Sequence, residues 1–116
     1  MFSKTPKELI LKDFSNILNK SHAVSELIAN RRFDSDLAIL TTAEIYAIAE
    51  KSYVRCDTFP ELQTTEVEDF VNAFDQFYFE LKQILFHDQD DFLSLSKRMA
   101  EMQTAFETLS TSFNMI

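Results

Sequence analysis

The stretch TEVEDFVNAFDQFYFELKQILF, residues 65–86, decides the fold of this chain. Its apolar residues recur in steps of three and four, which places them along one side of an α-helix. Thr65 followed by Glu68 has the spacing of a capping box, so the helix is predicted to begin there. A helix with so wide an apolar stripe must bury it against other elements of the chain. The stripe consists of Val67, Phe70, Val71, Phe74, Phe77, Tyr78, Leu81, Ile84 and Leu85.

A second periodic stretch follows over residues 90–113. Its apolar residues alternate steps of three and four over three heptads, the pattern of a helix that packs along a partner helix. Asp88 or Asp90 is expected to cap this helix at its N-terminus. Two adjacent heptad helices joined by so short a loop are predicted to form an antiparallel hairpin. The apolar positions of the last helix are Phe92, Leu95, Met99, Met102, Phe106, Leu109 and Phe113.

The first helix is predicted over residues 6–30. Thr5 is a suitable N-cap, Pro6 follows at the first helical position, and Glu8 completes a capping box. Apolar residues then recur with a period of three or four. Polar residues of low helix propensity gather near Asn19–Ser21, so a kink or a break there is the alternative to one continuous helix.

The second helix is predicted over residues 36–56, with Asp34 or Ser35 as its cap. Its apolar residues surround the helix instead of forming a narrow stripe, so it is expected to be the most buried element. Thr41 with Glu44 has the spacing of another capping box. The alternative is therefore a helix that restarts at this point, preceded by a short turn.

The four segments predict an all-α fold and a single helical domain over residues 1–116. The expected architecture is an antiparallel up-down four-helix bundle with a C-terminal heptad helical hairpin. The 116 residues, 46% of them apolar, are enough to bury a core without disulfides or metal. The chain contains no glycine, which excludes Gly-rich phosphate loops, dinucleotide fingerprints and nucleophile elbows. No stretch approaches the roughly 20 apolar residues of a membrane span, and the single Cys56 fits a reducing cytoplasm.

Catalytic and metal-binding groups are scarce in this sequence. Neither His22 nor His87 follows a glutamate by three residues, as a di-iron bundle requires. Asp88, Asp90 and Asp91 lack the glycine turn and the distal glutamate of a calcium-binding loop. We interpret these aspartates as residues that stabilise a helix N-terminus. We therefore expect no enzymatic activity, no cofactor and no metal site.

Charge is distributed unevenly along the chain. Residues 1–56 carry eight Lys or Arg and seven Asp or Glu, a net charge of +1, whereas residues 57–116 carry three and twelve, a net charge of −9. A nucleic-acid-binding protein is expected to have a basic face, so we predict no direct contact with nucleic acid and none with anionic membranes. A strongly acidic surface favours a basic protein partner. The alternative is an acidic face that only keeps the protein soluble.

Two phenylalanines lie off the apolar stripe of residues 65–86. Phe79 and Phe86 are seven residues apart and about 140° from the centre of the stripe, so they share one face of the helix. Charged and polar residues surround them on that face. An aromatic pair framed by charge is typical of a protein interface, and the alternatives are burial in a homodimer or against another helix of the same chain.

These observations favour a non-enzymatic module that binds a basic protein, such as a nuclease or another nucleic-acid-handling protein, and masks its surface. The second hypothesis is a self-associating structural or adaptor protein that forms a homodimer. Small, acidic, all-helical chains without catalytic residues resemble in type the immunity proteins, antitoxins and phage inhibitors of host enzymes, but no motif is shared and no residue role carries over. The predicted partner-binding residues are Glu66, Glu68, Asp69, Asp75, Phe79, Glu80, Phe86, Asp88, Asp90 and Asp91.

Overall fold

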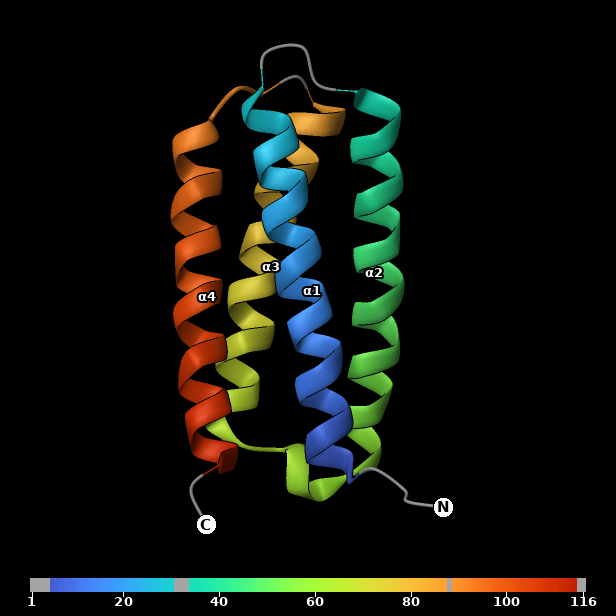
Figure 1. Ribbon diagram of the computed structural model, residues 1–116, viewed down its shortest axis with the longest axis vertical. Helices are drawn as coiled ribbons and strands as arrows, with labels where there is room; N and C mark the ends of the chain where they lie inside the picture. The colour runs from blue at the N-terminus through green and yellow to red at the C-terminus, as the bar shows by residue number, and fades with distance from the viewer. Residues whose placement is uncertain (1–4, 31–33, 88, 115–116) are drawn as a thin grey trace.

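The computed structural model describes residues 5–30, 34–87 and 89–114, and this part of the chain is almost entirely helical (Figure 1). The elements in order are α1 (Pro6–Ala29), α2 (Ser35–Thr58), the short 3₁₀ helix η1 (Pro60–Leu62), α3 (Thr65–Phe86) and α4 (Phe92–Asn114). The predicted all-α fold is confirmed, and the four predicted helices match the observed ones to within two residues at each end.

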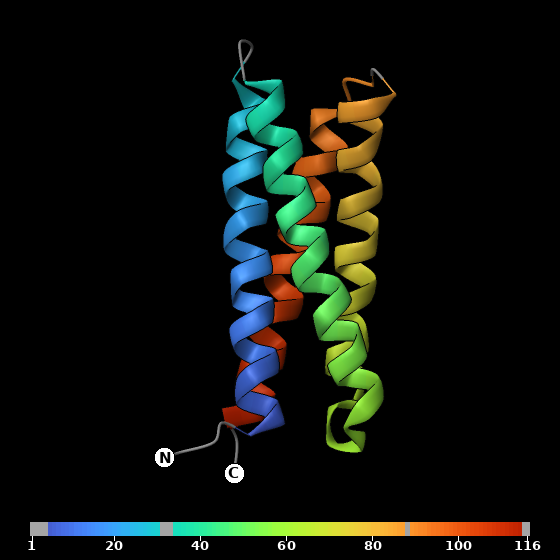
Figure 2. The same cartoon turned by 90° about the vertical axis from the view of Figure 1, so that its right-hand side faces the viewer.

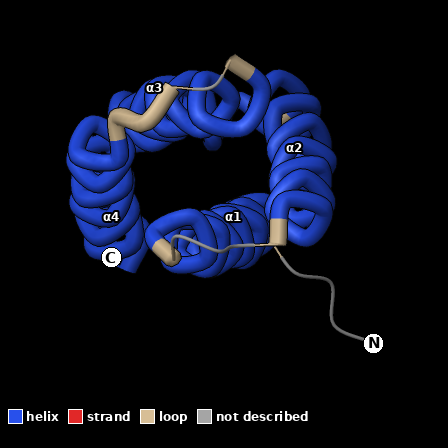
Figure 3. Tube along the Cα trace, turned by 90° about the horizontal axis from the view of Figure 1, so that it is seen from above, coloured by secondary structure: helices blue, strands red, loops and turns tan. Residues whose placement is uncertain are grey.

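The helices form an antiparallel up-down bundle (Figure 1), and the end-on view shows that each helix lies beside the next one along the chain (Figure 3). Seen end-on, the order around the bundle is α1, α2, α3, α4 (Figure 3). α1 packs against both α2 and α4, and α3 packs closely along α4, which forms the predicted C-terminal hairpin. The packing between α2 and α3 is the sparsest of the four neighbouring pairs. In Figure 2, α2 slants across this side of the bundle and its C-terminal end lies near the start of α3.

Aromatic side chains meet at the centre of the bundle. The rings of Phe14 on α1 and Phe70 on α3 stack with their centroids 4.2 Å apart, although these helices are diagonal to each other. Phe106 on α4 meets Phe70 edge-on at 6.1 Å. Phe14 and Phe70 are both buried. Together with Phe106 they form one cluster, to which α1, α3 and α4 each contribute a ring. Such a cluster combines a large buried apolar area with favourable ring geometry.

A buried ion pair joins α1 to α2. The Asp13 side chain is 6% exposed, and its carboxylate lies 2.8 Å from the Arg55 guanidinium and 3.4 Å from the Lys51 ammonium. A buried carboxylate is tolerated in an apolar interior only when it is paired and hydrogen-bonded. Asp13 therefore fixes the register of α2 along α1.

Two of the predicted N-caps, Thr5 and Asp34, are confirmed. The Thr5 hydroxyl accepts a hydrogen bond from the Glu8 backbone N–H at 3.2 Å, and Asp34 accepts one from the Leu37 N–H at 3.1 Å. Each side chain satisfies a backbone donor that lacks a partner within the helix.

The other two caps differ from the prediction, although α3 begins at Thr65 as predicted and α4 begins two residues later than predicted. Thr64 caps α3 and Thr65 does not, because the Thr64 hydroxyl accepts the hydrogen bond of the Val67 N–H. Asp91 caps α4 by accepting a hydrogen bond from the Ser94 N–H at 2.9 Å. The prediction of Asp90 as the cap was therefore wrong, and Asp88 lies outside the described residues.

Neither of the predicted alternatives, a break in the first helix or a restart of the second, is observed. α1 runs without interruption through Asn19–Ser21, and Ser21 is buried. Thr41 lies inside α2 and donates its hydroxyl hydrogen bond to the Leu37 carbonyl, which a residue in the second turn of a helix can do.

The expectation that α2 is the most buried helix was wrong. Only one flank of α2 is closely packed, against α1, while its contact with α3 is sparse. The apolar residues of α2 that do not pack against a neighbouring helix therefore face outward. Half of the exposed large apolar side chains among the described residues lie on α2. The five on α2 are Leu37, Ile39, Leu40, Tyr46 and Val54.

Candidate functional site

An exposed stripe runs along α3 on the side away from the core. Glu68, Asp75 and Lys82 follow one another at intervals of seven residues, and Phe79 and Phe86 lie between and beyond them. The two rings are 54% and 53% exposed. A phenylalanine that is half exposed leaves a large apolar area in water, and this helix has two such rings among its charged residues.

A matching stripe lies on the neighbouring edge of α2. Ile39, Tyr46, Glu50 and Asp57 are all exposed and recur at intervals of seven and four residues. The two stripes meet at the α2–α3 seam, where the Tyr46 ring lies 5.7 Å from the Tyr78 ring and the Tyr53 hydroxyl donates to Asp75. Phe79 lies farther round α3, where it lines a hollow together with Arg98 of α4. We call the two stripes together the α2–α3 face, defined by Ile39, Tyr46, Glu50, Asp57, Glu68, Asp75, Phe79, Lys82 and Phe86.

The α2–α3 face carries an excess of negative charge. Four of its nine residues are carboxylates, and Lys82 is its only basic residue. The Lys82 ammonium lies 4.6 Å from the centre of the Tyr78 ring, in cation–π geometry. The face thus combines exposed rings with carboxylates that have little internal compensation.

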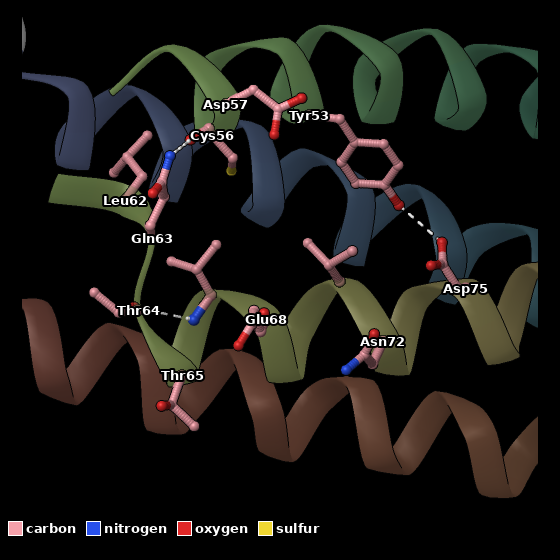
Figure 4. A pocket seen from close by; sticks show the side chains of 12 residues that line it. Tyr53, Cys56, Asp57, Leu62, Gln63, Thr64, Thr65, Glu68, Asn72 and Asp75 are labelled. Atoms are coloured by element: carbon pink, nitrogen blue, oxygen red, sulfur yellow. Dashed lines mark hydrogen bonds between the residues drawn. The ribbon is translucent and has the colours of Figure 1, made fainter. Parts of the chain in front are cut away.

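The lower end of this face is hollowed into a groove of about 680 Å³ between the end of α2 and the start of α3 (Figure 4). Asp57, Glu68 and Asp75 are the charged residues among the described residues that line it. Leu62, Val67 and Val71 supply apolar surface. The groove is therefore acidic and partly apolar, and no Lys or Arg among the described residues lines it.

Local sequence explains why the groove forms at this place. Phe59 and Pro60 end α2, since proline disfavours a helical residue before it. Leu62 of η1 is then fully buried beneath α1 and α2, and Thr64 starts α3 with its side-chain cap. This connection holds the end of α2 and the start of α3 at the groove.

A hydrogen bond closes the groove on its upper side. The Tyr53 hydroxyl donates to the Asp75 carboxylate at 2.9 Å, from α2 to α3 (Figure 4). Burial, together with the negative charge of Asp75, raises the pKa of Tyr53 well above its ordinary value. Tyr53 therefore remains a neutral donor, and it is one of the few polar links across the sparse α2–α3 seam.

The structure divides the predicted partner-binding residues among several surfaces. Glu68, Asp75, Phe79 and Phe86 come together on the α2–α3 face. Glu66 and Asp69 instead line a hollow of about 550 Å³ between α3 and α4.

The remaining predicted residues lie elsewhere. Glu80 is half-buried beside Phe79 and Arg98, and Asp90 is exposed before α4. Asp91 accepts hydrogen bonds from the Ser94 hydroxyl and N–H, which lower the pKa of Asp91. Asp88 is outside the described residues.

Sequence reasoning missed the contribution of α2 to this face. Ile39, Tyr46, Glu50 and Asp57 were not singled out, because the apolar residues of α2 seemed to require burial all around. Their spacing of seven, four and seven residues was the available signal. It would have indicated a separate stripe away from the Ala38, Ile45 and Ser52 positions that face the core.

Residues 5–30, 34–87 and 89–114 show no sign of metal chemistry or of a membrane-spanning helix. No cluster of three or more His, Cys, Asp or Glu side chains there has the arrangement of a metal site. None of the helices in this part of the chain is both long and apolar enough to cross a bilayer. Comparison with protein-family models, with curated proteins and with solved structures finds no match to this chain.

Cys56, which lines the groove, is expected to be a slow nucleophile in the folded protein. Burial, with a smaller contribution from the Asp57 charge, raises the pKa of the thiol from 9.0 to about 11. At pH 8 this shift leaves about 100-fold less thiolate than in the unfolded chain. Alkylation by iodoacetamide, followed by mass spectrometry, is therefore expected to be at least about 10-fold slower in buffer than in urea. Equal rates in the two conditions would contradict the buried environment of this thiol.

Proposed function

We propose that this protein is a non-enzymatic binding module that covers a basic surface of another protein with its α2–α3 face. The observation that carries the proposal is the pair of half-exposed rings, Phe79 and Phe86, on the same stripe as the carboxylates Glu68 and Asp75. Exposed aromatic residues supply most of the binding energy in many interfaces. Acidic residues around them select a basic partner and accelerate its association.

The kind of partner follows from the same face. A protein whose working surface is basic, such as a nuclease or another nucleic-acid-handling protein, would lose access to its substrate when this face covers it. An inhibitory, immunity or antitoxin role in the cytoplasm is the corresponding biological proposal. A homodimer formed through the α2–α3 face is less favoured, because it would bring four carboxylates of one copy against four of the other.

The proposal is tested with a defined basic probe. We would add a helical peptide of about 20 residues, with leucines at steps of three and four and lysines at the other positions, to ¹⁵N-labelled protein and follow the amide spectrum. Perturbations are expected to concentrate on the α2–α3 face, and binding is expected to weaken with salt. Phe79→Ala with Phe86→Ala is expected to weaken binding at least 10-fold, since each removes a desolvated ring.

A matched pair of charge variants distinguishes specific from general attraction. Glu68→Gln lies on the face, whereas Glu107→Gln removes the same charge from an exposed site on α4. The first is expected to reduce affinity more than the second. Equal effects of the two variants, or perturbations spread evenly over all acidic residues, would contradict the proposal.

A further inference from the structure

A second apolar surface lies on α2, on the side that faces directly away from the core. It consists of Leu40, Ala43, Ala47 and Val54, which we call the α2 outer stripe. All four are exposed, Leu40 by 56% and Val54 by 65% of its surface. The steps of three, four and seven residues place them on one line along the helix. None of these residues belongs to the α2–α3 face.

We infer that the α2 outer stripe pairs with the same stripe of a second copy, antiparallel, about a two-fold axis through Ala47. About this axis, a residue of one copy lies opposite a residue of the other copy when their residue numbers add up to about 94. Leu40 of one copy then meets Val54 of the other, twice, and Ala47 meets Ala47. The small side chains at the centre allow the two helices to approach to about 8 Å, at the close end of helix packing distances.

The charges beside the stripe agree with this register. Glu44 and Lys51 lie on the same edge of the stripe, next to α1, and their numbers add up to 95. In an antiparallel pair, residues on the same edge of the two helices meet. Glu44 of each copy therefore lies opposite Lys51 of the other, one residue from alignment, which is an offset of about 1.5 Å along the helix.

The existing ion pairs extend this arrangement. Glu44 is already 2.6 Å from Lys20, and Lys51 is 3.4 Å from Asp13, while all but Asp13 remain substantially exposed. Pairing of two copies would join these contacts into a chain of alternating charges, Lys20, Glu44, Lys51 and Asp13. Networks of this kind are more effective than isolated surface pairs.

Net charge also selects this side of the bundle for self-association. Among the described residues, 5–30 and 34–58 carry five Lys or Arg and eight Asp or Glu, a net charge of −3, whereas 65–87 and 89–114 carry three and nine, a net charge of −6. Two copies that meet through α2 beside α1 avoid the repulsion that α3 and α4 would impose. Because one helix from each copy makes the contact, the area is smaller than the roughly 800 Å² per partner of a standard interface. We expect a dimer that dissociates in the micromolar range.

The register is tested by cross-linking in a Cys56→Ser background. Ala47→Cys lies on the axis and is expected to oxidise to a disulfide-linked dimer with itself. Leu40→Cys is expected not to cross-link with itself, since the two copies of this residue would be about 21 Å apart along the helices. A mixture of Leu40→Cys and Val54→Cys proteins is expected to give the mixed dimer. Efficient self-linking of Leu40→Cys would overturn the register.

Sedimentation equilibrium over about 1 to 500 μM tests the dimer itself. Ala47→Glu is expected to weaken it at least 10-fold, because it places two like charges across the axis. Lys51→Glu is expected to weaken the dimer, and Glu44→Lys added to it is expected to restore it. Circular dichroism melting checks that each variant is folded.

Phe79→Ala separates this inference from the proposed function. That variant alters the α2–α3 face and is expected to leave the dimer unchanged. A monomer at every concentration, or a dimer that Phe79→Ala disrupts and Ala47→Glu does not, would overturn the inference.

Discussion

Replacing Phe70 with alanine is expected to lower the free energy of unfolding by about 4 kcal/mol. Phe70 is 1% exposed, stacks on Phe14 at 4.2 Å and meets Phe106 edge-on at 6.1 Å. The substitution removes the ring from a cluster to which three helices contribute, and those helices cannot all move inward to fill the space. For a domain whose total stability is about 5–15 kcal/mol, this is a large fraction. Urea denaturation measures it as a lower midpoint with an unchanged m-value.

Phe79→Ala is the matched control for this experiment. It makes the same chemical change on the same helix at a half-exposed position. Its effect on the free energy of unfolding is expected to be about 0.5 kcal/mol or less, as for most surface substitutions. A loss at Phe70 no larger than the loss at Phe79 would show that the ring cluster does not form the centre of the core.

Replacing Asp13 with alanine is expected to lower the free energy of unfolding by about 3 kcal/mol. The substitution leaves the Arg55 guanidinium largely buried without its carboxylate partner at 2.8 Å. The value lies at the low end for a broken buried ion pair, because the side chain of Arg55 is still 19% exposed. Thermal and urea unfolding are both expected to show the loss.

Two further variants separate the cost of an unpaired charge from lost packing. Adding Arg55→Met to Asp13→Ala is expected to recover a large part of the stability, because it removes the unpaired guanidinium and retains an apolar side chain. Glu44→Ala breaks the exposed pair with Lys20 and is expected to cost less than about 1 kcal/mol. If the double variant is less stable than Asp13→Ala alone, desolvation of Arg55 is not the cause.

Most of the fold follows from patterns within single helices. The periods of residues 65–86 and 90–113 predicted two helices and their pairing, and Thr5 and Asp34 predicted two starts. The start of α3 at Thr65 was correct, but its cap was assigned to Thr65 instead of Thr64, because the two threonines are adjacent and chemically equivalent as caps. The start of α4 was misplaced because three aspartates offer the same capping chemistry. Local sequence therefore gives the helix, while the geometry of the turn selects the capping residue.

Properties that depend on neighbouring helices were not predictable in the same way. Phe79 and Phe86 were identified on the outer side of α3 because their angle from the apolar stripe is a property of that helix alone. The matching stripe of α2, from Ile39 to Asp57, depends on α2 packing closely with α1 and only sparsely with α3. The buried Asp13 was also missed, since its burial depends on Arg55, which lies 42 residues away.

The sparse seam between α2 and α3 has a consequence for hydrogen exchange. α2 is held closely along one flank only, by α1, and its links to α3 include the Tyr53–Asp75 hydrogen bond and the Tyr46–Tyr78 ring contact. We therefore expect separation of α2 from α3 to require less free energy than global unfolding, and we expect the amides of α2 to be less protected from hydrogen exchange than those of α3 and α4. The helix that contributes to both proposed binding surfaces is thus also expected to open more readily than α3 and α4.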